Sequence, residues 1–158
     1  MAIQAYVALS AADGFFKRPI DNHGKLRTVY NKFVTAVVGD IGSTFAMGKL
    51  PPGAVRVLYP FCFVKTSALG AGVTLSIGHA AYRSKQDQNT LNDGIEPASV
   101  NAFASALDMS AAARLSFSAT LLKFDLYSLA GVDVIATSAG AVVPAAATIE
   151  TLMTYIYE

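Results

Sequence analysis

The stretch from Ala54 to Thr66, AVRVLYPFCFVKT, decides the fold. Side chains alternate between the two faces of a β-strand, and one face of this stretch would be wholly apolar. That face would carry Val55, Val57, Tyr59, Phe61 and Phe63. The opposite face is apolar as well, because it would carry Leu58, Cys62 and Val64. Pro60 has no backbone N–H, which favours an edge position or a bulge. We therefore expect an edge strand that meets another subunit or is covered by an arm of its own chain.

Short strands separated by turns are predicted on both sides of this stretch. Pro52 and Gly53 directly before it fit a type II turn. Further strands are expected at 27–38, 43–47, 73–77, 115–121, 132–136 and 148–157, with Gly- or Pro-rich turns between them. The pattern predicts an all-β fold, a jelly-roll-like antiparallel β-sandwich. We expect residues 1–24 to be an N-terminal arm or first strand, and residues 25–158 to be a single sandwich domain.

One insertion, residues 82–113, is predicted to interrupt the strands. Residues 82–96 are polar and are expected to form a long exposed loop. This loop offers several carboxylate and amide oxygens but breaks the order of an EF-hand, so a solvated loop is favoured. Pro97 suits the first turn of a helix. Val100, Phe103, Ala104 and Leu107 follow at helical spacing, so a short amphipathic helix is predicted.

The composition indicates contact with other protein chains. Apolar residues make up 53% of the sequence and charged residues only 15%, against about 45–50% and about 25% in typical domains. The longest apolar run, residues 139–147, is Ala-rich, contains Pro144 and is too short to span a membrane. Surplus apolar surface on a soluble protein usually marks an interface. We therefore expect self-association and protein partners, and no membrane.

The charge is small overall but unevenly distributed along the chain. The net charge of +1 argues against direct nucleic-acid binding through a basic field. Residues 1–80 hold eight Lys and Arg against three Asp and Glu, a net of +5, whereas residues 81–158 have a net of −4. This asymmetry could help subunits associate head to tail or bind an acidic partner. The alternative is that folding mixes the two signs of charge over one surface.

No catalytic, cofactor-binding or metal-binding constellation is visible. Cys62 is the only cysteine and lies between two phenylalanines, as a buried structural thiol does. His23 and His79 lack the spacing of a zinc site, and phosphate-loop and nucleophile-elbow motifs are absent. Because triads assemble in space, a hydrolase built from distant residues stays open at this point. We expect a protein that is not an enzyme and needs no cofactor.

The candidate interface combines a basic, aromatic segment near the N-terminus with aromatic strand residues. The basic, aromatic segment near the N-terminus is proposed as a docking arm. The alternative is that it forms an ordinary core strand. Aromatic side chains on a sandwich surface anchor interfaces or stack on sugars. The candidates are Phe15, Phe16, Lys17, Arg18, Tyr59, Phe61, Phe63, Tyr155 and Tyr157.

Three stretches resemble small β-sandwich structural proteins of tailed bacteriophages, of the capsid decoration or cement type. They are residues 48–58 (GKLPPGAVRVL), 66–79 (TSALGAGVTLSIGH) and 143–157 (VPAAATIETLMTYIY). The resemblance covers about a third of the chain and excludes residues 82–113. It implies a virion protein, made in the host cytoplasm, that binds the major capsid protein on the outer shell surface as a homotrimer. The alternatives are a head–tail connector, a neck or fibre-base protein, or a carbohydrate-binding sandwich.

Overall fold

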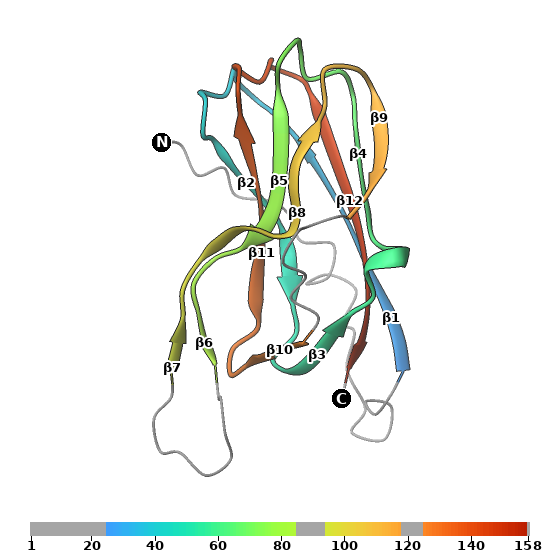
Figure 1. The fold of residues 1–158 in the computed structure, drawn as a ribbon, viewed down its shortest axis with the longest axis vertical. Helices are drawn as coiled ribbons and strands as arrows, with labels where there is room; N and C mark the ends of the chain where they lie inside the picture. The colour runs from blue at the N-terminus through green and yellow to red at the C-terminus, as the bar shows by residue number, and fades with distance from the viewer. Residues whose placement is uncertain (1–24, 85–93, 118–124, 158) are drawn as a thin grey trace.

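The computed structural model describes residues 25–84, 94–117 and 125–157, which form two facing antiparallel sheets (Figure 1). The larger sheet contains β1 (Lys25–Val34), β3 (Gly53–Val57), β4 (Phe63–Thr66), β6 (Tyr82–Ser84), β7 (Gly94–Glu96), β9 (Ala113–Ser116), β10 (Asp125–Ser128) and β12 (Thr148–Tyr157). The smaller sheet contains β2 (Thr44–Leu50), β5 (Thr74–His79), β8 (Ser99–Asp108) and β11 (Val132–Ala139). The predicted all-β, antiparallel sandwich is confirmed.

The strand order is that of a jelly roll. The larger sheet contains the series β1-β12-β4-β9, and the smaller sheet has the order β2-β11-β5-β8. The chain crosses between the sheets from β1 to β2, from β4 to β5, from β8 to β9 and from β11 to β12. Two interlocked Greek keys of this kind define a jelly roll. Strands β3, β10, β6 and β7 extend the larger sheet beyond this series.

The core lies between the sheets because one side of each strand is apolar. In the smaller sheet, Leu75 and Ile77 of β5 lie beside Val134 and Ala136 of the neighbouring β11 in one buried cluster. The opposite sheet supplies Val57, Val64 and Ile149 to the same cluster. Apolar burial of this kind contributes about 25 cal/mol per Å², which makes the core the main source of stability.

The stretch that decides the fold is two central strands joined by a short 3-10 turn. β3 pairs with β10 and β12, and β4 pairs with β12 and β9, so the predicted edge position is wrong. Residues Tyr59–Phe61 form the turn, which places Pro60 where no ladder hydrogen bond is needed. The turn also shifts the alternation: Tyr59 points inward, and Cys62 and Val64 follow on the inward side. Phe61 and Phe63 consequently belong to the outward face and not to the face of Val55 and Val57.

The predicted helix is wrong, because residues 99–108 form strand β8. β8 pairs with β5, and its register shifts twice along the pair. Each shift inserts extra residues on β8, which changes the face to which the following side chains point. Phe103, Ala104 and Leu107 are all buried as a result. Bulges in a strand therefore produced the spacing that resembles a helical stripe.

Residues 82–113 are likewise an integral part of the sandwich and not an insertion. β6 continues β5, β7 leads into β8, and β6 and β7 pair with each other. This long hairpin begins in the smaller sheet and reaches the larger one, where Ser84 pairs with Ser128 of β10. Figure 1 shows β6 and β7 at the lower end of the molecule. Residues 85–93, the tip of the predicted loop, lie outside the described residues.

Candidate protein interface

The outward side of β1, β12, β4 and β9, here called the β1–β9 face, carries large side chains. Strand pairing aligns them in rows across the sheet: Tyr30 of β1 lies opposite Leu152 of β12, which lies opposite Phe63 of β4. Leu26, Tyr30 and Val34 of β1 are exposed, and Leu152 and Ile156 of β12 are half-buried. Several large exposed apolar side chains on one sheet face are a usual mark of an interaction site.

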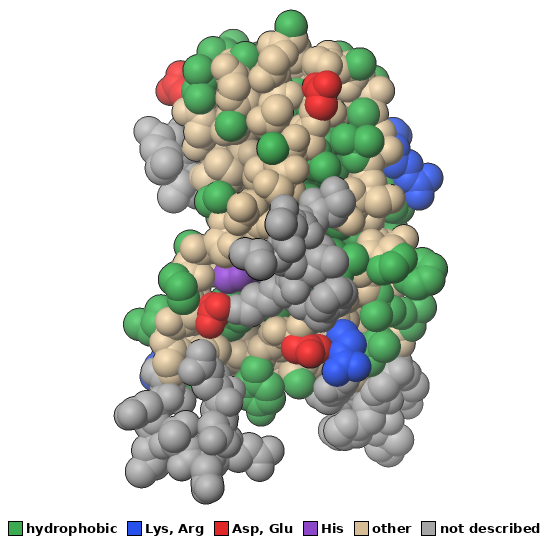
Figure 2. Space-filling model, viewed as in Figure 1, with side chains coloured by type: hydrophobic (Ala, Val, Ile, Leu, Met, Phe, Trp, Pro, Cys, Tyr) green, Lys and Arg blue, Asp and Glu red, His purple; other side chains and the backbone are tan. Residues whose placement is uncertain are grey.

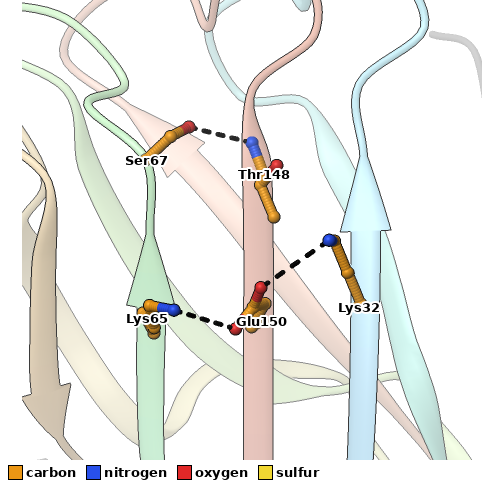
Figure 3. Close-up of polar contacts among 5 residues, drawn as sticks. All are labelled: Lys32, Lys65, Ser67, Thr148 and Glu150. Atoms are coloured by element: carbon orange, nitrogen blue, oxygen red, sulfur yellow. Dashed lines mark hydrogen bonds and ion pairs between the residues drawn. The ribbon is translucent and has the colours of Figure 1, made fainter.

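A row of charges crosses the same face. Glu150 of β12 lies between Lys32 of β1, at 3.9 Å, and Lys65 of β4, at 3.5 Å (Figure 3). Arg114 of β9 is the cross-strand partner of Lys65 and extends the row. The row therefore holds three cations and one anion. Desolvation and then the nearby Glu150 carboxylate raise the pKa of the Tyr30 hydroxyl.

A hollow of about 440 Å³ opens on this face beside the 3-10 turn. Its lining residues are Pro60, Phe61, Cys62, Phe63, Arg114, Ser116, Leu152 and Thr154. The Arg114 guanidinium lies over the Phe63 ring, 3.8 Å from its centroid, in a cation–π contact. Phe61 is 62% exposed at the rim. The hollow thus combines apolar walls with one guanidinium, a combination that suits an apolar segment bearing a carboxylate.

Cys62 is a structural residue of this hollow. Its Sγ donates to the Leu58 carbonyl oxygen at 3.2 Å and accepts from the Thr154 backbone N–H at 3.2 Å. Burial raises the pKa of the thiol to about 11, and the Thr154 hydrogen bond only partly opposes the shift. A thiolate nucleophile needs the reverse shift, so Cys62 is unsuited to covalent chemistry.

The opposite surface, the outward side of β2, β11, β5 and β8, carries mostly small side chains and one exposed ion pair, Lys49 with Asp133. This β2–β8 face is made of half-buried or buried residues on three strands: Thr44, Ala46, Thr74, Ser76, Gly78, Ile135 and Thr137. Figure 2 views the molecule from this side and shows only a few scattered charged side chains. The Ser76 hydroxyl accepts from the Ala106 backbone N–H of β8 at 3.0 Å, so this side chain bonds within the sheet.

The sequence-predicted interface residues separate into three groups. Tyr59 and Tyr155 are buried in the core, so they do not contribute to an exposed surface. Phe61 is exposed and Phe63 and Tyr157 are half-buried, and Phe61 and Phe63 come together at the hollow. Phe15, Phe16, Lys17 and Arg18 lie outside the described residues.

Sequence reasoning missed the residues that give this face its charge and most of its apolar area. Arg114, Lys65, Leu26 and Tyr30 were not among the candidates. A detectable signal was present in β1, where Leu26, Tyr30 and Val34 alternate with Val29 and Phe33. Apolar residues on both faces of a strand indicate that both faces are covered, and the described residues cover only one of them.

The described residues hold no cluster of potential metal ligands. Within them, no group of three or more His, Cys, Asp or Glu is placed to hold a metal ion. His79 is 1% exposed, with Nδ1 3.0 Å from the Ala80 carbonyl oxygen and its ring against Tyr82 and Phe103. His23 lies outside the described ranges. No helix in the part of the chain that the structure describes is long and apolar enough to cross a membrane.

Fold and surface together define a jelly-roll β-sandwich with one apolar, cationic outward face. No protein-family model matches the sequence, and no curated protein matches it. Among solved structures, a chain of the capsid of Ralstonia phage GP4 has a TM-score of 0.64 at 15% identity, covering 87% of this chain and 88% of that chain. A chain of the cyanophage Pam1 capsid asymmetric unit has a TM-score of 0.60 at 16% identity, covering 86% and 87%. At these identities the likeness establishes a shared fold.

Proposed function

We propose that this chain is a non-enzymatic structural protein of a phage virion that binds and stabilises the outer surface of an assembled capsid. The observation that carries the proposal is the fold shared along nearly the whole chain with chains of two phage capsids. Coverage is nearly equal in both directions, so a single sandwich of this size accounts for most of each neighbour. The partner we propose is the major capsid protein, and the expected assembly state is a homotrimer.

The β1–β9 face supports this proposal with a plausible mechanism of attachment. Exposed Leu26, Tyr30, Val34 and Phe61 would be covered at contacts with neighbouring chains. Apolar area buried in this way favours association, and association entropy offsets part of the gain. The excess of cations in the row around Glu150 would favour acidic surfaces on the partner. Repetition over a shell would multiply the stabilisation from each contact.

The proposal is tested by adding the purified chain to capsid shells that lack it. We expect the chain to sediment with the shells, to saturate at a fixed ratio to the major capsid protein, and to raise the temperature at which shells disassemble. A chain that leaves shells unbound but attaches to tails, necks or glycans would overturn the proposal.

Matched variants tie the binding to the β1–β9 face. Phe61→Ser is expected to weaken shell binding by about 10-fold or more, because interface aromatics carry much of the binding energy. Ile95→Ser, at the exposed Ile95 of β7, is the control, since it makes a similar change away from this face. Equal loss from both variants would show that another surface binds the shell.

A further inference from the structure

A rigid turn between β1 and β2 projects side chains that its own fold does not use. The Ser43 N–H donates to the Asp40 carbonyl oxygen at 3.0 Å, which closes a turn over residues 40–43. Gly42 has a φ of +82°, as the third position of a type II turn requires. The Gly42 N–H donates to Ser138 at 3.0 Å, and Gly39 and Val143 exchange backbone hydrogen bonds of 2.8 and 3.1 Å. The turn is therefore held in one conformation by the neighbouring strand and loop.

The side chains of this turn and of the residues just before it are mostly apolar, and one carboxylate lies among them. Val37, Val38 and Ile41 are each about 60% exposed, at 58%, 59% and 61%. Val142, on the loop bonded to the turn, is also exposed. Asp40 is exposed between them, and no ion pair joins its carboxylate to another described residue. A preorganised turn of this kind loses little entropy on binding a partner, which makes it a suitable docking element.

The hollow on the β1–β9 face has the complementary chemistry. Its walls include Phe61, Pro60 and Leu152, which suit the side chains of Val38 and Ile41. Arg114 stands at its edge, and none of the ion pairs among the described residues involves it. The Arg114 guanidinium carbon lies 3.8 Å from the Phe63 ring centroid, a contact that leaves N–H donors able to receive a carboxylate.

The two elements cannot meet within one chain. The turn is tied to the start of β2 and to β11, whereas the hollow adjoins the 3-10 turn between β3 and β4. Figure 1 shows β2 and this 3-10 turn on opposite sides of the sandwich. For this turn to occupy a hollow of this kind, the hollow must therefore belong to another copy of the chain.

We propose that residues 38–41, which lead into and begin this turn, dock in the hollow of a second copy, with Asp40 paired to Arg114. Such a contact is heterologous, so it builds a ring where the rotation closes and a filament where it does not. The inference deepens the proposed function and rests on its expectation that copies associate. A single turn covers only part of the roughly 1,600 Å² of a standard interface, so a closed ring, in which each copy makes two contacts, is the expected form.

Charge reversal tests the pairing. In sedimentation velocity, Asp40→Lys and Arg114→Glu are each expected to raise the dissociation constant of self-association by about 100-fold, because like charges would face each other. The double variant, Asp40→Lys with Arg114→Glu, restores an attractive pair and is expected to recover at least 10-fold of that loss. Asp133→Lys and Lys49→Glu, at the exposed Lys49–Asp133 pair, are the matched controls and should associate like the wild type.

The outcomes separate this inference from the proposed function. Thermal unfolding confirms that each variant folds before its association is measured. A double variant as dissociated as the single variants, or single variants that associate normally, would overturn the pairing of Asp40 with Arg114. A wild-type chain that stays monomeric yet coats shells refutes the contact and leaves the proposed function standing. A chain that forms rings but does not bind shells supports the contact and refutes the proposed function.

Discussion

The two outward faces of the sandwich differ in side-chain size and charge, although both belong to antiparallel sheets of one jelly roll. The β1–β9 face exposes Leu26, Tyr30 and Phe61 around a row of charges. The β2–β8 face carries Thr, Ser, Ala and Gly beside Ile135 and one exposed ion pair, Lys49 with Asp133, and its backbone comes close enough at Gly78 to exclude any side chain. The comparison teaches that two sheets of one sandwich can differ outwardly: one exposes large apolar side chains around a row of charges, and the other is closely packed within the chain.

The largest expected effect comes from adding a side chain to the close-packed face. A Cβ atom at Gly78 would overlap the backbone of Ser99 and Val100 in β8. Because backbone atoms cannot move aside as a flexible side chain can, Gly78→Val is expected to lower the free energy of unfolding by about 3 kcal/mol or more. Urea unfolding followed by circular dichroism measures this change. Wild-type stability in the variant would mean that the two strands are not in contact there.

The second prediction compares two aromatic residues of the 3-10 turn: Tyr59, which is buried, and Phe61, which is exposed. Tyr59→Ala removes a buried ring that contacts Phe103 and is expected to cost about 3 kcal/mol of unfolding free energy. Phe61→Ala removes an exposed ring and is expected to change stability by less than about 0.5 kcal/mol. The same unfolding measurement checks both variants. Equal losses would show that Phe61 is packed within the chain.

The third effect concerns the charge row on the β1–β9 face. Glu150→Gln leaves Lys32 and Lys65 without their shared carboxylate, and we expect a loss of about 1 kcal/mol at low salt. The loss should shrink with added salt, because screening weakens repulsion between exposed cations. Asp133→Asn, which removes the carboxylate of a single exposed pair with Lys49, is the control and should cost less. A loss that does not vary with salt would indicate a packing role for Glu150.

The smallest effect is a gain in unfolding free energy from a substitution on the β2–β8 face. Thr137 Oγ1 is buried and has no hydrogen-bond partner among the described residues. Thr137→Val keeps the shape and removes the unpaired oxygen, so unfolding free energy should rise by about 0.5 kcal/mol. The neighbouring Ser138 is the control, because its hydroxyl donates to the Ser43 carbonyl oxygen at 3.3 Å and Ser138→Ala should be destabilising. Destabilisation by Thr137→Val would show that this hydroxyl is bonded in solution.

The fold was largely predictable from the sequence, and the interface only in part. Alternation in β5 and β11 follows directly from one buried face, so these strands and the sandwich were foreseeable. β8 was not, because its bulges gave Val100, Phe103 and Leu107 a helical spacing. The faces of Phe61 and Phe63 were missed because the 3-10 turn at Pro60 changes the alternation. Arg114 became a candidate only when strand pairing placed it beside Lys65.

Hydroxyl-radical footprinting of shell-bound and free protein tests the central claim most directly, because it reports the solvent exposure of individual side chains. We predict that Leu26 and Tyr30 of the β1–β9 face become protected on the shell, while Ile135 of the β2–β8 face reacts as it does in the free protein. Protection of Ile135, with Leu26 and Tyr30 as reactive as in the free protein, would contradict the assignment of the β1–β9 face to partner chains.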